Sequence, residues 1–284
     1  CLTTSVVRSS TYFFLFLFLI ACSNSSNQSV VNGEAFGTTW QIKFYKNTTD
    51  FKDQELELKI NNELERIDSI FSLYDKNSTI SQINQDQSLQ WNRTNGYEDF
   101  SKLIKISDEV TNKSGGYYQV FINGKWDFNS IAKGYAVDRL SQILESYGLT
   151  NYMVEIGGEI KFSGKKPQLN WTFAIIDPTF EERLFEEFQV NKNFSIATSG
   201  NYRNPGHIID PSSKISVESN LLSVSVIDEV STARADAWAT ALFASKEDWL
   251  SIADNYNLAA FFIYKDNKVI KSISTDRWQE MLRL

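Results

Sequence analysis

The chain has 284 residues, 42% of them hydrophobic and 14% aromatic, which is enough for a packed core in one large domain or two small ones. Its formal net charge is −7 and its pI is near 5.0, and no cluster of Lys and Arg stands out, so a nucleic-acid-binding surface is excluded. A phosphate-bearing ligand would therefore need local help from helix N-termini, backbone amides or a bound cation.

The N-terminal residues differ in composition from the rest. Arg8 precedes an apolar run over residues 12–21, which is too short to cross a bilayer but has the length of a signal-peptide core. The run ends in Leu19-Ile20-Ala21-Cys22, which resembles the lipobox of bacterial lipoproteins, where the peptide is cut before the cysteine and the thiol is acylated. An ordinary signal peptide that contains a cysteine is the alternative.

We therefore expect three segments: a signal peptide at residues 1–21, a polar tether at 22–32 after a lipidated Cys22, and one domain at 33–284. The protein would then sit in the cell envelope, anchored by lipid to a membrane face outside the cytoplasm. Since the sequence starts with Cys1 and not Met, we expect the true start to lie upstream. No free cysteine would remain for a disulfide, a thiol nucleophile or a metal.

The first predicted elements of the domain form a scaffold. The pattern of residues 37–45 alternates well enough to predict a strand. The spacing of Leu56, Ile60, Leu64, Ile67 and Phe71 predicts an amphipathic helix with Asp53 as its N-cap. Residues 71–84 are an aromatic turn that runs into a short Ser-capped helix. Tyr74 in this turn is a candidate for stacking on a planar ring, with packing in a turn or core as the alternative.

A further helix around residues 100–110 is ended by Gly115-Gly116, and another begins at residue 131 and ends at Gly148. The second helix carries Lys133-Gly134 in its first turn, where glycine costs about 1 kcal/mol relative to alanine. Something is therefore expected to approach there, either a ligand or cation, or a closely packed strand.

The middle of the chain is predicted to form strands. Residues 152–156 and 159–162 flank Gly157-Gly158, which either approaches a ligand or closes a hairpin. Further strands are expected at 171–176, 185–190 and 194–197. The last leads into a loop over residues 198–203, whose Thr198, Ser199 and Gly200 offer short donors to an anion.

His207 is the only histidine in the chain and lies in a short strand-like piece between turns. Because its unperturbed pKa is near neutrality, it is the natural candidate for proton transfer, with a structural role as the alternative.

Residues 225–244 read as a strand and then an alanine-rich helix capped by Ser231 or Thr232. Asp236 and Thr240 are four residues apart, so their oxygens lie one turn apart on one helix face. Such a pair suits a small hard cation that takes its other ligands from water and phosphates, whereas a helix-capping role is the alternative. A helix near 247–256, a hairpin at 259–273 and a closing helix from Thr275 complete the chain.

Helices and strands are interleaved without a regular βαβ rhythm, and hairpins predominate. The prediction is an α+β fold, a single domain with a largely antiparallel sheet flanked by helices.

Taken together, these motifs resemble the ApbE family of FAD:protein FMN transferases over roughly residues 33–275. The combination is specific, above all Ala-Lys-Gly-Tyr-Ala-Val-Asp at 132–138, Ala-Thr-Ser-Gly-Asn-Tyr at 197–202, His-Ile-Ile-Asp-Pro at 207–211 and Ala-Asp-Ala-Trp-Ala-Thr-Ala at 235–241. The resemblance implies an ApbE-like, T-fold-related fold.

The resemblance also implies an activity: Mg²⁺-dependent transfer of FMN from FAD to a Thr or Ser hydroxyl of a target protein, with release of AMP. It implies Mg²⁺ ligands at Asp236, Thr240 and the carbonyl of Ala132, with Asp236 thereby part of the catalytic machinery, and His207 as the base for the attacking hydroxyl. FAD contacts are implied for Tyr74, Lys133, Gly157, Gly158, Glu159, Thr198, Ser199 and Gly200. Of these, Tyr74 is assigned to the ring and Glu159 to a sugar or adenine hydrogen bond.

Two departures from the family pattern concern substrate choice. The family usually has Gly-x-Phe-Asp-Pro where this chain has Gly-Tyr-Tyr-Gln-Val at 116–120, and the connections that follow Gly116 and Arg203 are short. A different protein substrate or a more open site is expected. Implied partners are FAD, a membrane redox subunit or exported flavoprotein as target, and the membrane itself.

Two other functions are kept open. One is a Mg²⁺-dependent FAD pyrophosphatase, in which water replaces the protein hydroxyl and FMN and AMP are released. The other is a flavin-binding lipoprotein without catalysis.

Overall fold

The computed structural model describes residues 28–46, 51–86, 88–167, 169–202 and 205–283. The expected signal peptide and Cys22 lie outside these residues. Part of the expected tether does not, because residues 28–32 belong to a strand, Gln28–Ala35, which pairs with the next strand along its whole length. The expected boundary at residue 33 is therefore wrong, since the folded domain already includes residue 28.

The helices are α1 (Asp53–Phe71), α2 (Thr79–Gln85), α3 (Tyr97–Lys113), α4 (Ala132–Ser146), α5 (Thr232–Ala244), α6 (Trp249–Asn255) and α7 (Asp276–Leu282), with a short 3-10 turn at Trp91–Arg93. The strands are β1 (Gln28–Ala35), β2 (Thr38–Tyr45), β3 (Phe121–Ile122), β4 (Lys125–Trp126), β5 (Tyr152–Ile156), β6 (Glu159–Ser163), β7 (Trp171–Ile176), β8 (Leu184–Val190), β9 (Phe194–Gly200), β10 (Leu221–Asp228), β11 (Ala259–Asp266) and β12 (Val269–Ser274). In the part of the chain that the structure describes, no helix is long and apolar enough to span a membrane.

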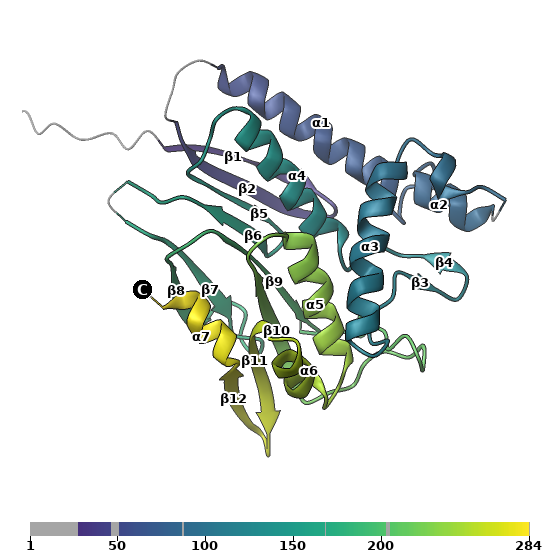
Figure 1. Ribbon diagram of the computed structural model, residues 1–284, viewed down its shortest axis with the longest axis vertical. Coiled ribbons are helices and arrows are strands. Elements are labelled where there is room, and N and C mark those ends of the chain that lie inside the picture. Colours follow the sequence, from purple (N-terminus) through teal and green to yellow (C-terminus); the bar gives the residue numbers. More distant parts are fainter. Residues whose placement is uncertain (1–27, 47–50, 87, 168, 203–204, 284) are drawn as a thin grey trace, which may run out of the picture.

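The main sheet has eight strands in the order β1-β2-β5-β6-β9-β10-β11-β12, and every neighbouring pair is antiparallel (Figure 1). The strand pairs β3–β4 and β7–β8 form separate two-stranded sheets. This arrangement confirms the predicted α+β class with a largely antiparallel sheet.

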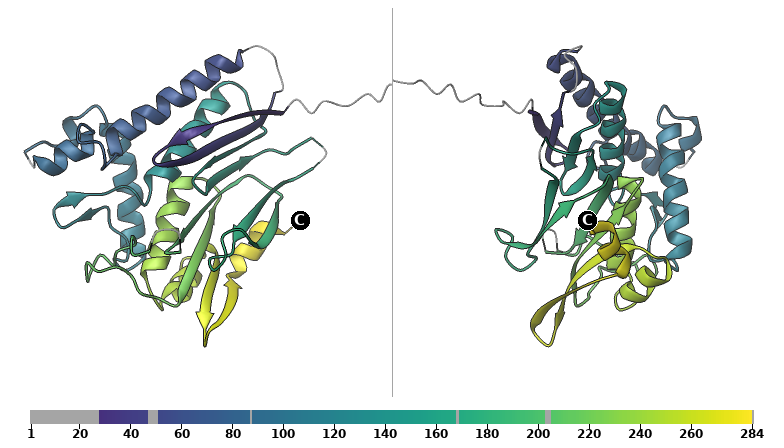
Figure 2. Two further views of the ribbon diagram at one scale, coloured as in Figure 1. Left: turned by 180° about the vertical axis from the view of Figure 1, so that it is seen from behind. Right: turned by 60° about the vertical axis from the view of Figure 1, so that its left-hand side comes forward.

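Apolar side chains alternate along the strands and so create two cores, one on each face of the main sheet. On one face, α4 and α5 pack over the sheet, and α3 lies on the outer side of α5 (Figures 1 and 2). On the other face, β7, β8 and α7 cover a smaller aromatic core that includes Phe162, Trp171, Phe194 and Trp278. The first core is the one that positions the site.

The sequence pattern of α1 is confirmed, because Leu56, Ile60, Leu64 and Ile67 are all buried. Its predicted cap is wrong. The N-cap is Lys52, whose side chain makes no capping hydrogen bond, and Asp53 is already the first helical residue. A carboxylate in the first turn still interacts favourably with the helix dipole, which explains why the acidic residue marks the start of the helix.

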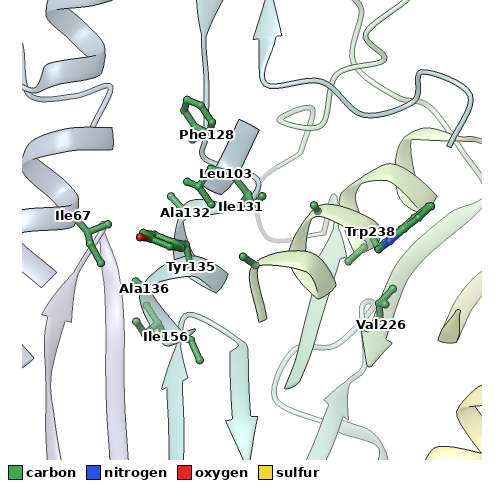
Figure 3. Close-up of a cluster of buried hydrophobic side chains, with 14 of the residues drawn as sticks. Ile67, Leu103, Phe128, Ile131, Ala132, Tyr135, Ala136, Ile156, Val226 and Trp238 are labelled. Atoms are coloured by element: carbon green, nitrogen blue, oxygen red, sulfur yellow. The ribbon is translucent and has the colours of Figure 1, made fainter. Parts of the chain in front are cut away.

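Buried charges tie α1, α3 and α4 together. Arg66 donates to both oxygens of Asp99 at 2.9 Å, and the hydroxyl of Tyr135 donates to the same carboxylate at 2.5 Å. Although burial alone raises the pKa of Asp99, the hydrogen bonds from Arg66 and Tyr135 outweigh it and lower that pKa. The network fixes the first turns of α4 against the outer helices, and Figure 3 shows Tyr135 there beside Ile67 of α1.

Candidate active site

The site is built where the first turn of α4 meets α5. The backbone N–H of Gly134 donates to Oδ2 of Asp236 at 3.2 Å. A Cβ on Gly134 would lie 2.6 Å from the carbonyl oxygen of Thr232 and 2.8 Å from Cα of Ala233, so only glycine lets the two helices come this close. Of the two explanations for this glycine, close packing is confirmed, although its neighbour is a helix and not the expected strand.

The alanine-rich composition of α5 serves the same packing. Ala235, Ala237 and Ala239 are fully buried, because α5 lies between the sheet and the outer helices. Small side chains allow its backbone to approach β9 and β10 closely, and Trp238 fills the remaining space above Val226 (Figure 3). The predicted Ser231 cap is confirmed, since its side chain accepts from the backbone N–H of Arg234.

Asp236 is almost fully buried, with 4% of its surface exposed. Burial, together with the nearby charge of Glu159, holds the pKa of its carboxyl well above the usual range, and the charge of Lys133 and the Gly134 N–H only partly compensate. In the described residues its one hydrogen bond is the one from Gly134. A cation that approaches the remaining lone pairs would stabilise the charged form of this buried carboxylate, which has only one hydrogen-bond donor.

Lys133 and Glu159 form an ion pair beside this carboxylate, with Nζ and Oε2 2.6 Å apart. Glu159 is 2% exposed, whereas 31% of the Lys133 side chain is exposed. The Glu159 carboxylate faces Lys133 through Oε2. The expected hydrogen bond between Glu159 and a sugar or adenine stays a prediction. Lys133 is the member of the pair that reaches solvent and can meet an anion.

Thr240 lies one turn beyond Asp236, is partly buried, and its hydroxyl is 3.2 Å from the Ser199 hydroxyl. Ser199 comes from β9, so the prediction of a loop over residues 198–203 is wrong for its first three residues. Alternation along a strand turns Thr198 to the opposite face, where it bonds the Ser225 hydroxyl at 2.7 Å. Ser199 thus joins the site, whereas Thr198 faces away from α5. Gly200 ends the strand against β10, with the Leu222 carbonyl 2.7 Å from where its Cβ would be.

Ala132 opens α4 and is 8% exposed. The carbonyl of the N-cap residue Ile131 accepts the first helical bond, from Tyr135 at 2.9 Å, and the Ala132 carbonyl is the next in the ladder. A carbonyl oxygen in the helix has a second lone pair for another partner. Ala132 precedes by two residues Gly134, whose N–H contacts Asp236. The role of the Ala132 carbonyl as a metal ligand stays a prediction.

Gly157 and Gly158 turn β5 into β6 with φ angles of +59° and +107°, which favour glycine. Gly157 donates to the Thr39 carbonyl at 3.1 Å, and Gly158 donates to the Glu155 side chain at 2.8 Å. The two glycines close a hairpin, as one alternative predicted, and deliver Glu159 to Lys133. Flavin contact by either glycine stays a prediction.

Tyr74 lies between α1 and α2 and is 92% exposed, so its ring is available for stacking. The short helix that follows begins at Thr79 with the predicted serine cap, Ser78. Stacking of Tyr74 on a flavin stays a prediction.

His207 is exposed on a turn that leads from β9 to β10. Its segment forms only an isolated bridge between Ile209 and Ser216 rather than a strand. Two contacts hold the turn: Val217 donates to the Ile208 carbonyl at 2.9 Å, and Lys246, just beyond α5, donates to Asp210 at 2.7 Å. His207 is thereby tied to the helix that carries Asp236 and is open to a large substrate.

Asp138 is the site-forming residue to which sequence reasoning gave no role. It projects from α4 to the N-terminus of α5 and accepts from the backbone N–H groups of Thr232 and Ala233 at 2.9 and 3.1 Å. The signals were its place four residues after Gly134 and at the end of the motif at 132–138. Nothing in local spacing shows which helix such a carboxylate will cap.

Within the described residues, no three or more His, Cys, Asp and Glu side chains gather into a cluster that could hold a metal. A cation here would depend on one carboxylate and neutral oxygens, the kind of donor set that Mg²⁺ accepts when phosphates and water complete it. Cavities of about 330 and 320 Å³ lie elsewhere, one between α6 and α7 and one on β1, β2 and β5, and neither is lined by Asp236 or Thr240.

Comparison with known proteins gives consistent results. The model of the ApbE family matches residues 36–126 and 123–262. An FAD:protein FMN transferase of Vibrio cholerae is 27% identical over 94% of this chain and 96% of its own length, and one from Escherichia coli K12 is 25% identical over 94% and 95%. The solved flavin transferase ApbE from Vibrio cholerae superposes with a TM-score of 0.79 and 26% identity, covering 90% of this chain and 99% of that one.

Proposed function

The chain belongs to the ApbE family, and from that premise we propose that it is an FAD:protein FMN transferase. In the proposed reaction, the hydroxyl oxygen of a Thr or Ser on a target protein attacks the phosphorus on the FMN side of the FAD diphosphate. A new phosphoester bond forms, the bond to the AMP phosphate oxygen breaks, and AMP leaves. The hydroxyl proton passes to a base on the enzyme.

One observation carries the proposal: the hydrogen bond between Gly134 and Asp236. It joins, at one place, two segments that are remote in the chain and that both carry predicted site residues. Lys133 and Glu159 lie beside this bond, and Ser199 contacts Thr240 on the same helix. Four of the predicted segments are therefore linked by direct contacts.

The same residues fit the Mg²⁺ ion that the family implies. Asp236 provides a buried carboxylate with a single amide partner in the described residues, and Thr240 provides a hydroxyl one turn later. We propose these two side chains and the carbonyl of Ala132 as its ligands. Bound there, Mg²⁺ would neutralise charge on the diphosphate, which is the main requirement of phosphoryl transfer.

The protein's own groups supply positioning. Lys133 reaches solvent from the ion pair with buried Glu159, so it can hold a diphosphate oxygen while its stem stays fixed. His207 accepts the hydroxyl proton, because it is an imidazole exposed on a segment anchored beside α5 and histidine is the most common general base. Ser199 orients Thr240 through their hydroxyl contact.

We further propose that the protein works outside the cytoplasm, tethered through a lipid on Cys22, and that its targets are membrane redox subunits or exported flavoproteins. The lipobox-like Leu-Ile-Ala-Cys at 19–22 and the apolar run before it support this placement.

The proposal is tested by incubating the protein with Mg²⁺, FAD labelled in the flavin ring, and envelope proteins of its own organism. A labelled band that survives denaturing electrophoresis is the expected result, and the same gel would identify the target. Free FMN and AMP without a labelled band would instead identify an FAD pyrophosphatase. Intact FAD after long incubation would point to a binding protein.

A further inference from the structure

The two helices of the site exchange hydrogen bonds reciprocally. In α4, Gly134 donates its N–H to Asp236 of α5 at 3.2 Å. In α5, Thr232 donates its N–H to Asp138 of α4 at 2.9 Å. Each helix thus offers an amide in its first turn and a carboxylate four residues later, and each carboxylate meets the amide of the other helix. The relative position of α4 and α5 is set by this pair of contacts.

The two carboxylates, Asp138 and Asp236, differ in how many hydrogen bonds they accept. Asp138 accepts from the Ser231 hydroxyl at 2.8 Å and from the Thr232 and Ala233 amides at 2.9 and 3.1 Å, and Lys161 Nζ lies 3.5 Å away. Asp236 has the Gly134 amide alone among the described residues. Saturated hydrogen bonding suits a fixed structural anchor, whereas unused lone pairs suit a ligand.

Asp138 also meets α5 where a negative charge is most favourable. The first turn of a helix exposes N–H groups that have no partner within the helix, and its dipole attracts an anion there. The local cap, Ser231, satisfies the Arg234 amide, and Asp138 supplies the remaining partners from another helix. Movement of α5 along its axis or away from α4 would break the three hydrogen bonds that Asp138 accepts from Ser231, Thr232 and Ala233.

We propose that Asp138 is a positioning residue for the metal site: it fixes the start of α5 so that Asp236 and Thr240 face the first turn of α4. The inference rests on the proposed function for the identity of the cation, and it concerns a residue that touches neither metal nor substrate. Outer partners that orient metal ligands typically change metal affinity by 10–100-fold when removed.

The test measures Mn²⁺ binding to the detergent-solubilised full-length chain by electron paramagnetic resonance, without FAD. Asp138→Ala should weaken Mn²⁺ binding about 10-fold or more. Asp138→Asn keeps one acceptor oxygen for the Thr232 amide, so its Mn²⁺ affinity should lie between those of the wild type and Asp138→Ala. In the flavin transfer reaction, half-saturation by Mg²⁺ should rise in both variants, while the rate at saturating Mg²⁺ recovers most of its wild-type value.

Asp177→Ala is the matched control. Asp177 is also buried, 3% exposed, and also accepts a backbone N–H, that of Thr179 at 2.8 Å, together with the Thr179 hydroxyl and Arg183, but it lies at the turn between β7 and β8. This variant should lose thermal stability and keep wild-type Mn²⁺ affinity.

Wild-type Mn²⁺ affinity in a folded Asp138→Ala protein would overturn the inference and leave Asp138 as a structural cap. If that variant does not fold, Asp138→Asn decides by the same criterion. Weakened Mn²⁺ binding in the variants with no flavin transfer by the wild type would uphold the inference and refute the proposed function. No Mn²⁺ binding by the wild type would refute the metal site and the inference together.

Discussion

Gly134 and Asp236 are 102 positions apart in the chain, yet the backbone N–H of the first donates to the carboxylate of the second at 3.2 Å. The contact places a buried carboxylate at the first turn of another helix, next to Lys133, which reaches solvent. An anionic ligand that approaches this point meets the exposed end of Lys133, beside the carboxylate that we propose as a cation ligand.

Replacement of Gly134 by alanine should separate the two helices. The added Cβ would lie 2.6 Å from the Thr232 carbonyl oxygen, and backbone cannot yield as a flexible side chain does. We expect a loss of about 1–3 kcal/mol in the free energy of unfolding, even though alanine favours helix by about 1 kcal/mol. Urea denaturation measures the change. Gln142→Ala, on the exposed side of the same helix, should stay within about 0.5 kcal/mol of wild type, and equal stability of both variants would contradict the packing argument.

Removal of the Lys133 side chain should affect both stability and ligand binding. Because Glu159 is buried, Lys133→Ala should lower the free energy of unfolding by about 2 kcal/mol, less than for a fully buried pair since the lysine is 31% exposed. The double variant Lys133→Ala/Glu159→Gln should regain stability but not FAD affinity. Urea denaturation and flavin fluorescence titration separate the two effects, and FAD affinity restored in the double variant would refute the assigned role of Lys133.

Substitution of His207 should slow transfer without disturbing the fold. As His207 is exposed, His207→Gln is expected to unfold at the wild-type temperature and to bind FAD normally, while the rate of flavin transfer falls about 10²–10⁴-fold. Single-turnover kinetics measure the rate. Glu218→Gln, an exposed change on the same segment, serves as control, and an unchanged rate in His207→Gln would assign proton transfer to another group.

The segment that carries His207 should loosen in acid. Hydrogen bonds from Lys246 and then Ser212 hold the pKa of Asp210 below its ordinary value, despite burial. A depressed pKa in the folded state stabilises the protein fully above the unfolded-state pKa of about 3.9. This contribution declines below that value and is lost as pH falls through the lower pKa of the folded state. Asp210→Asn should therefore cost more stability at pH 7 than at pH 3. Urea denaturation at both pH values tests this, and an equal cost at both would refute it.

Sequence periodicity predicted α1 well because this helix buries one apolar face. The spacing of Leu56, Ile60, Leu64 and Ile67 identified α1, and the small residues of α5 identified the helix that carries Asp236. Hairpin turns were equally clear, since glycines with positive φ mark them, as at Gly157.

Most of the failures come from pairing with another segment, which the local composition does not show. Thr198, Ser199 and Gly200 have the composition of a loop, but pairing with β10 makes them a strand. Residues 28–32 read as part of a tether because they belong to an edge strand, β1, in which several side chains are exposed. Glu159 and Asp138 likewise acquired their roles from partners that local spacing does not reveal.

The most direct test compares AMP released with flavin bound covalently to protein in one reaction containing FAD, Mg²⁺ and envelope proteins. We predict equal amounts of AMP and protein-bound flavin for the wild type and neither product for Asp236→Asn, which keeps the shape of the side chain but loses its charge. AMP released without protein-bound flavin, or full transfer by Asp236→Asn, would contradict this prediction.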